Sequence, residues 1–159
     1  MQSTYQLENE LMNEAYTELK LHHALHSELR EKLTKALGER FINGLELADT
    51  HKVRRYDFNP SGRTVWVVQG RKDEYQVIPK IPFCYCDDYY FRVMEKKRGL
   101  CYHIIAQRIA EALDQYEKIA KVDIEYSSIT NHWRAVDKQE KNSADPTDSG
   151  IWALSLGSV

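Results

Sequence analysis

The chain has 159 residues, a mass of 18.6 kDa and a net charge of −2, with 42% hydrophobic residues, so we expect one domain with extensions. The sequence contains no apolar run near the ~20 residues of a membrane span, and no secretory signal is visible. Its three cysteines are an odd number, which argues against a disulfide framework. We therefore expect an intracellular protein with reduced thiols and no membrane partner, nuclear if the source is eukaryotic and cytoplasmic if it is archaeal.

The charges are unevenly distributed along the chain. Residues 1–50 hold 5 Lys/Arg and 9 Asp/Glu, residues 51–108 hold 12 and 6, and residues 109–159 hold 5 and 9. A basic middle between acidic ends indicates either an anionic partner or charges that complement each other within the fold. Both interpretations stay open at this point.

The first 50 residues are predicted to be helical. Apolar residues recur every four positions in two series, at Leu7, Leu11 and Ala15 and at Leu21, Leu25, Leu29, Leu33 and Leu37. This spacing gives an apolar stripe, either on one helix or on two helices with a break near residues 19–20. Gly38 is a candidate helix end, and residues 40–48 form a further amphipathic segment. The stripes either cover the core of this chain or bind a partner, a second copy included.

Residues 53–78 change to a strand-like pattern. The runs 53–58, 64–68 and 74–78 alternate or are rich in β-branched and aromatic residues. Turn sequences at 59–62 and 70–73 separate them. We predict a three-stranded antiparallel meander.

Two short pairs of metal-binding residue types follow the meander. They are Cys84-x-Cys86 and, fourteen residues later, Cys101-x-His103. Zinc favours four tetrahedral thiolate and imidazole ligands, and a full set leaves no open position for chemistry. The second pair lies where a loop enters a helix, whose N-terminal amides favour thiolates. We predict one structural Zn²⁺ bound by these four residues; inert buried cysteines and a redox Cys-x-Cys pair are the alternatives.

A helical pattern begins at Cys101 and continues to Tyr116, and after Ile119 the signal fades. The predicted fold class is α+β: N-terminal helices, the three-stranded antiparallel meander, a zinc finger leading into a C-terminal helix, and a flexible tail. The expected divisions are a helical region at 1–50, the meander with finger and helix at 51–119, and a largely flexible extension at 120–159.

The C-x-C…C-x-H arrangement, placed after a β-hairpin and opening a helix, resembles the SWIM zinc finger. The alanine that usually follows the histidine of that finger is present as Ala106. Upstream, residues 37–49, 60–63 and 65–70 resemble the SWIM subunit of Shu-type homologous-recombination complexes. The similarity covers about residues 35–116.

This resemblance implies a non-catalytic adaptor in DNA recombination and DNA damage repair. Such an adaptor pairs with a RecA/RadA-type recombinase paralogue and promotes or stabilises recombinase filaments on single-stranded DNA, which it contacts directly or through the partner. The sequence has no Walker phosphate-binding loop, so ATP would come with the partner, and we expect no enzymatic activity. Self-association stays possible.

A stand-alone zinc-dependent nucleic-acid-binding module is the alternative function. Its candidate phosphate contacts are basic residues of the strands, turns and finger loop: Arg54, Arg55, Arg63, Arg71, Lys96, Lys97 and Arg98. Tyr56, Trp66 and Tyr75 are base-stacking candidates only if exposed, and their strand positions favour the core. His22 and His26, at i and i+4, are more typical of solvent or interface positions than of a second metal site.

Overall fold

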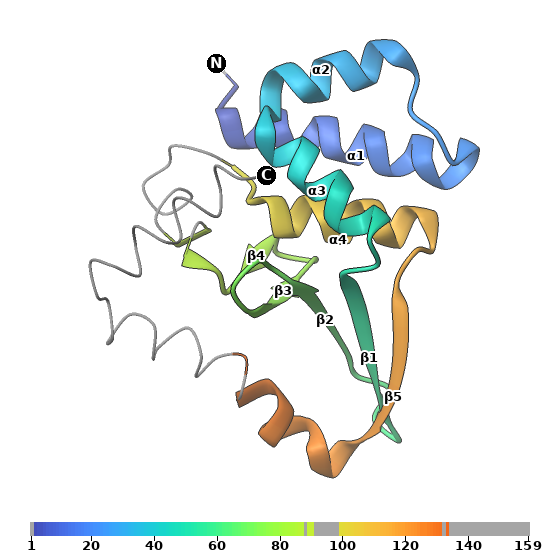
Figure 1. Cartoon of the computed structure of the whole chain (residues 1–159), viewed down its shortest axis with the longest axis vertical. Coiled ribbons are helices and arrows are strands. Elements are labelled where there is room, and N and C mark those ends of the chain that lie inside the picture. The colour runs from blue at the N-terminus through green and yellow to red at the C-terminus, as the bar shows by residue number, and fades with distance from the viewer. Residues whose placement is uncertain (1, 88, 91–98, 132, 134–159) are drawn as a thin grey trace.

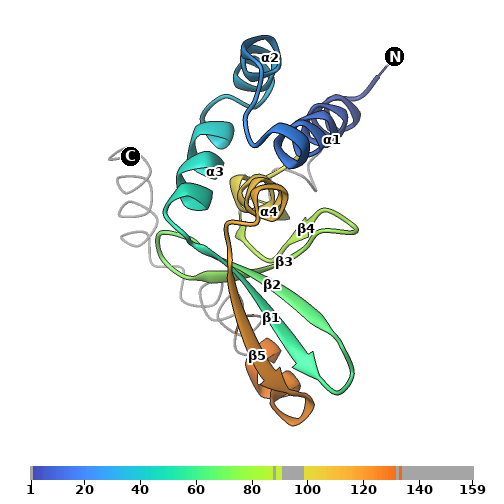
Figure 2. The ribbon, with the colours of Figure 1, turned by 90° about the vertical axis from the view of Figure 1, so that its right-hand side faces the viewer.

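The computed structural model describes residues 2–87, 89–90, 99–131 and 133. Within these residues the chain forms a helical layer and a five-stranded sheet, which confirms the α+β class (Figures 1 and 2). The C-terminal tail beyond residue 133, expected to be flexible, lies outside the described residues. Among the helices of the described part, none combines the length and the apolar character that crossing a bilayer requires.

Three helices form the N-terminal region: α1 at Thr4–His22, α2 at Ser27–Leu37 and α3 at Glu39–Asp49. Ser3 caps α1 through a capping box with Gln6. The turn between α1 and α2 lies at residues 23–26, so the N-terminal pattern is two helices. Gly38 ends α2 with a φ of +60°, a conformation that favours glycine, as its place in the sequence predicts.

Most of the predicted leucine stripe covers the core of this chain. Five of its members are buried: Leu11, Ala15, Leu29, Leu33 and Leu37. The stripe of α1 differs from the predicted one at its start, because Leu7 is 43% exposed while Glu8 is buried beside it. Leu21, near the end of α1, is 68% exposed.

The predicted meander is present. Strands β1 (Val53–Asn59), β2 (Thr64–Gln69) and β3 (Glu74–Ile78) pair antiparallel in sequence order. Tyr56 faces Val65 across the first pair, and Trp66 faces Val77 across the second. The turn at residues 59–62 closes with hydrogen bonds between Phe58 and both Gly62 and Arg63.

Two further strands extend the meander to the order β4-β3-β2-β1-β5. The short β4 (Phe83–Cys84) continues the antiparallel arrangement and brings Cys84 opposite Val77. Strand β5 (Glu117–Val122) pairs parallel with β1 and forms the other edge. The sequence pattern does not predict β5, because its alternating residues are only half-buried and its partner is some 60 residues away.

The helix predicted from Cys101 is α4 (Tyr102–Leu113), which lies between the sheet and helices α1 and α3 (Figure 2). Nine of its twelve residues are buried. It ends earlier than the pattern suggests, because Asp114 adopts a left-handed conformation and turns the chain towards β5. The main core therefore surrounds α4, and the second cysteine pair lies at the start of this helix.

The opposite face of the sheet carries a second, smaller core. Residues 120–131, the first part of the extension expected to be largely flexible, complete β5 and form a 3₁₀ turn (Asp123–Glu125) and a helical segment at 126–131. Trp133 follows it and is 3% exposed, with its ring 5.0 Å from that of Tyr56 and its indole N–H donated to Glu74. The sheet is thus covered on both faces.

Candidate metal centre

The four residues predicted to bind zinc come from two places in the fold. Cys84 ends β4, and Cys86 follows two residues later, held by the hydrogen bond from the Tyr85 amide to the Gln76 carbonyl. Cys101 is the N-cap of α4, and His103 is the second residue of that helix. The sheet edge and the helix start therefore bring together two pairs that lie fourteen residues apart in the sequence.

The donor atoms of these four residues form a compact cluster. One atom from each of Cys84, Cys86, Cys101 and His103 lies within 4.8 Å of all the others, and each residue is at most 3% exposed. The Cys101 Sγ lies 4.0 Å from the His103 Nδ1. Tetrahedral Zn²⁺, with Zn–S near ~2.3 Å and Zn–N near ~2.0 Å, places its ligand atoms roughly 3.5–3.8 Å apart. The cluster fits one such ion after small side-chain shifts.

The thiols differ in their tendency to ionise. Burial raises the pKa of Cys84 and of Cys86 well above the usual thiol value. Burial also opposes ionisation of Cys101, but hydrogen bonds from Cys84, Cys86 and His103 outweigh it and hold the pKa of Cys101 well below the usual value. The lowered pKa makes Cys101 the thiol that ionises most readily, at the N-terminus of α4, where the helix dipole also favours negative charge.

The imidazole of His103 is enclosed by the fold. Its Nδ1 lies 4.0 Å from the Cys101 Sγ, and its Nε2 is buried with no hydrogen-bond partner among the described residues. The ring is held between Tyr75 and Tyr102, at centroid distances of 4.9 and 4.1 Å. A side chain at Gly70 would place its Cβ 2.8 Å from Nε2, so this glycine leaves room for the ring.

A backbone hydrogen bond further favours Cys86 as a ligand. The Tyr89 amide donates to the Cys86 Sγ at 3.2 Å. Such N–H···S contacts stabilise a negatively charged sulfur. All three cysteines are free, as the odd cysteine count predicts. Three thiols and one imidazole are a donor set that suits zinc.

Sequence reasoning missed two residues that shape this centre. Gly70 has the signature of a turn residue, and nothing local indicates that it faces His103. Glu8, one position from the predicted stripe, is buried and accepts hydrogen bonds from the Gly99 and Leu100 amides, just before Cys101. Glu8 is more than 70 residues from the cysteines in the sequence, so the pattern around the cysteines gives no indication of it.

The basic residues named as nucleic-acid contacts are dispersed. Arg54 forms an ion pair with Glu74, and Arg55 binds Asp57 through two hydrogen bonds of 2.8 and 3.1 Å. The guanidinium of Arg63 lies over the ring of Tyr126.

Arg71 lines a cavity of about 350 Å³ between α3 and the β2–β3 turn. Lys96, Lys97 and Arg98 lie outside the described residues. The aromatic residues Tyr56, Trp66 and Tyr75 are buried, as their strand positions predict.

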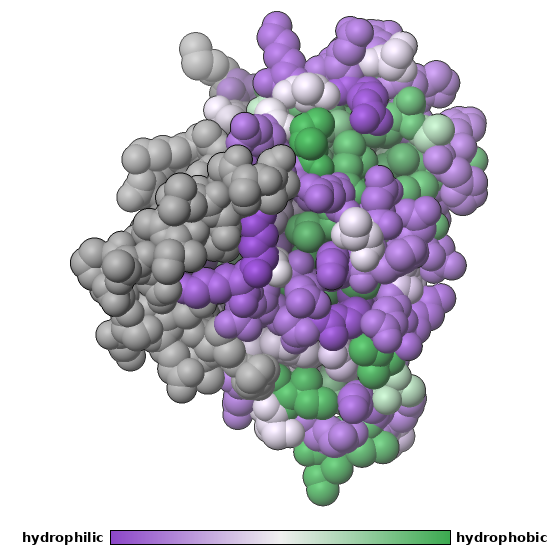
Figure 3. All heavy atoms as spheres, in the orientation of Figure 1, coloured by the Kyte–Doolittle hydropathy of each residue, from purple (hydrophilic) through white to green (hydrophobic). Residues whose placement is uncertain are grey.

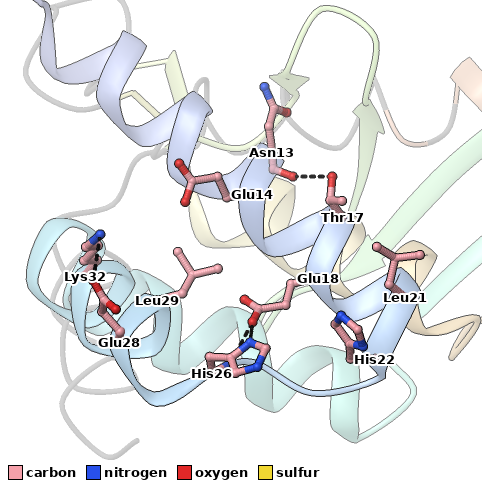
Figure 4. A pocket seen from close by; sticks show the side chains of 10 residues that line it. All are labelled: Asn13, Glu14, Thr17, Glu18, Leu21, His22, His26, Glu28, Leu29 and Lys32. Carbon is pink, nitrogen blue, oxygen red and sulfur yellow. Dashed lines mark hydrogen bonds and ion pairs between the residues drawn. The ribbon is translucent and has the colours of Figure 1, made fainter.

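His22 and His26 do not share a helix, because α1 ends at His22 and His26 caps α2. They belong to a groove of about 700 Å³ between α1 and α2, where His26 contacts the Glu18 carboxylate (Figure 4). The groove also contains Leu21 and Leu29. Among the described residues, the cysteine-histidine cluster is the one group whose donor atoms converge on a metal position.

The rest of the visible surface is mostly polar. Figure 3 shows polar side chains over much of the described face, with apolar patches near the helical layer and at the far end of β5. Val122 and Ile124, at that end of the sheet, are 52% and 90% exposed.

Comparison with known proteins finds a curated relative of this chain. No family model matches the chain, and no solved structure matches it. The chain is 35% identical over 86 residues to the "Zinc finger SWIM domain-containing protein 7 homolog" of Dictyostelium discoideum. The match covers 53% of this chain and 55% of the relative, so the chain spans about half the length of the curated relative it matches.

The name of this relative agrees with the geometry of the centre. A SWIM zinc-finger protein is a relative of this chain. Its name and the cluster of three cysteines and one histidine together support a zinc-binding module. The relative's name and the donor set each favour zinc as the metal.

Proposed function

We propose that this protein is a non-catalytic zinc-finger adaptor of homologous recombination that pairs with a RecA/RadA-type recombinase paralogue. The observation that carries the proposal is the closed set of four buried donors at the junction of sheet and helix. Four protein ligands satisfy tetrahedral zinc, so the ion has no position left for a substrate or an activated water. The zinc holds the finger together, and the protein acts through its surface.

The zinc would act here as a cross-link. Cys84 and Cys86 would bind it from the sheet edge, whereas Cys101 and His103 would bind it from the start of α4. The ion supplies a fixed tetrahedral connection that the thiols alone cannot make. The residues of this chain do the remaining work: they bury the site, orient the imidazole and present the helical layer to a partner.

Recombination as the context rests on the resemblance of the upstream segments, and the curated relative supports the zinc-finger part of the proposal. The upstream segments resemble the SWIM subunit of Shu-type complexes, and the curated relative is named for its SWIM domain. In this proposal the recombinase paralogue brings the ATP-binding site. Together the two proteins promote or stabilise recombinase filaments on single-stranded DNA.

The groove between α1 and α2 is the surface that we assign to the protein partner (Figure 4). It is lined by the apolar side chains of Leu21 and Leu29 and by the carboxylates of Glu14, Glu18 and Glu28. Within it, Glu18 is paired with His26 and Glu28 with Lys32. This chemistry suits an apolar segment with basic residues. By contrast, Arg54 and Arg55 are already engaged within the chain, which weakens the case for a stand-alone nucleic-acid binder.

Affinity capture tests the proposal. The full chain is co-expressed with recombinase paralogues from the same organism, and the lysate is treated with nuclease before capture. A stoichiometric, nuclease-resistant complex with one paralogue is expected. Leu21→Asp should lower the captured amount by about tenfold, because a buried charge at an interface costs more than ~1.4 kcal/mol. Val122→Asp, at the far end of β5, is the matched control and should leave capture unchanged.

The opposite outcome is equally well defined. If no paralogue is captured, and the isolated chain binds single-stranded DNA tightly with an affinity that falls steeply with salt, the protein is a stand-alone nucleic-acid-binding module. That result would overturn the adaptor role while leaving the zinc site intact.

A further inference from the structure

A buried carboxylate connects the first helix to the metal centre. Glu8 lies on α1 and is 1% exposed. Its Oε2 accepts hydrogen bonds from the Gly99 amide at 2.9 Å and from the Leu100 amide at 3.0 Å. These two residues immediately precede Cys101, so a side chain of the N-terminal region fixes the backbone that leads into the second ligand pair.

Arg40, from α3, completes the arrangement from the other side. Its guanidinium binds both oxygens of Glu8, with Nη2–Oε1 at 2.6 Å and Nη1–Oε2 at 3.1 Å. The same Nη1 donates to the Leu100 carbonyl at 2.6 Å. The amide and the carbonyl of Leu100 are therefore both held, the first by Glu8 and the second by Arg40. We refer to Glu8, Arg40 and the backbone of Gly99 and Leu100 as the Glu8–Arg40 clamp.

The clamp leaves little freedom for the residues it holds. A Cβ at Gly99 would lie 2.7 Å from the Glu8 Oε2 and 2.9 Å from the Tyr5 Cα, so the glycine allows α1 to approach the backbone directly. Leu100 is 2% exposed and belongs to the main core. Because hydrogen bonds to a buried charge are strong and specific, the position of Cys101 depends on the docking of α1.

We propose that Glu8 is a positioning residue of the zinc site, and that the Glu8–Arg40 clamp couples the docking of α1 to zinc binding. The inference rests on the proposed zinc-binding function and adds that the N-terminal helix is part of the zinc module. Groups that orient metal ligands typically change metal affinity by about 10–100-fold when they are removed. Glu8 fixes the backbone that immediately precedes the predicted ligand Cys101, so we expect an effect of this size when its carboxylate is removed.

Coupling of this kind is reciprocal. If α1 docking raises the zinc affinity by a given factor, zinc must stabilise α1 docking by the same factor. Occupancy of the metal site therefore changes the stability of α1 docking. Helix α1 also forms one wall of the groove assigned to the protein partner. Loss of zinc would loosen that wall without any direct contact between the ion and the partner.

Three substitutions in the full chain test the positioning role. Glu8→Gln keeps the shape of the side chain but replaces one acceptor oxygen by a donor that faces other donors. Glu10→Gln makes the same chemical change on the exposed surface of α1, outside the groove. Leu33→Ala removes a buried side chain of α2 and leaves a cavity in the core. This variant shows how far a loss of folding stability alone lowers the zinc affinity. Zinc affinity is measured by competition with a chromophoric chelator, and Co²⁺ absorption spectra report the ligand geometry.

The proposal predicts zinc affinity about 10–100-fold weaker for Glu8→Gln, with an altered Co²⁺ spectrum. Glu10→Gln should stay within about twofold of the natural protein. Leu33→Ala should lower the unfolding temperature and leave the Co²⁺ spectrum unchanged. Equal affinity in Glu8→Gln and the natural protein, or an equal loss in Leu33→Ala, would overturn the proposal.

A second measurement needs no variant. Hydrogen exchange of the natural protein with and without zinc should show slower exchange of the α1 amides around Glu8 when zinc is present. Unchanged exchange in α1, together with normal zinc binding, would refute the coupling and leave the zinc site standing. If the natural protein binds no zinc at all, it is the proposed function that fails.

Discussion

Replacing Gly70 by alanine should weaken zinc binding without disturbing the fold. An alanine Cβ at this position would lie 2.8 Å from the His103 Nε2 and 2.9 Å from the Tyr75 Cε2. Ordinary contact begins at about 3.5 Å, so the imidazole must move by roughly 0.7 Å or the turn must shift. Zinc–ligand distances tolerate only about 0.2 Å. The φ of Gly70 lies outside the left-handed region, so the effect is steric.

The expected loss of zinc affinity is about 10–100-fold, or about 1.4–2.8 kcal/mol. Gly62→Ala is the matched control, because Gly62 has a φ of +78° and a Cβ there would meet no atom within 4 Å. It should cost about 1–2 kcal/mol of folding stability through backbone strain and leave zinc affinity unchanged.

Chelator competition gives the affinity, and circular dichroism verifies that both variants are folded. Zinc binding by Gly70→Ala as tight as that of the natural protein would refute the placement of His103 against Gly70. The same holds if Gly62→Ala weakens zinc binding to the same extent, since the effect would then reflect stability alone.

Three other changes test further parts of the account. A structural zinc contributes about 10–16 kcal/mol, whereas a domain has about 5–15 kcal/mol of net stability. Cys101→Ser should therefore abolish zinc binding and unfold the finger, which rapid hydrogen exchange in α4 would reveal. Slow exchange in α4 of this variant would contradict the prediction. Since burial raises the pKa of Cys84 and of Cys86, zinc binding near pH 7 should release protons and should weaken as the pH falls. Calorimetry in buffers of different ionisation enthalpy measures this release, and a release of no protons would be inconsistent with the raised pKa values. Trp133→Ala should lower the free energy of unfolding by about 3–5 kcal/mol in denaturant titrations, because Trp133 is buried in the second core. The zinc stoichiometry should not change, since this core lies on the face of the sheet opposite the metal site. A negligible change in the free energy of unfolding would argue against the second core.

The parts of the structure that follow from local pattern could be predicted from the sequence. The three strands of the meander have β-branched and aromatic runs separated by turn residues, and the structure places them within a residue of the predicted bounds. The four metal ligands have a spacing that few other arrangements share, and the structure brings their donor atoms together. The meander signal spans residues 53–78, and the ligand signal spans residues 84–103.

The remaining parts depend on contacts between distant segments. Strand β5 is a half-exposed edge strand whose partner is β1, so its own residues carry only a weak pattern. Glu8 is inward-facing because its carboxylate has Arg40 and the Gly99 and Leu100 amides as partners, and a charged residue is expected to be exposed when those partners are unknown. Leu7, an apolar residue, is correspondingly the exposed neighbour.

The most direct test of the central claim is zinc K-edge X-ray absorption on the purified full chain loaded with one equivalent of zinc. Binding by Cys84, Cys86, Cys101 and His103 predicts a four-coordinate shell of three sulfurs at about 2.3 Å and one nitrogen at about 2.0 Å. A shell dominated by oxygen or nitrogen, or a folded chain that takes up no zinc, would contradict it.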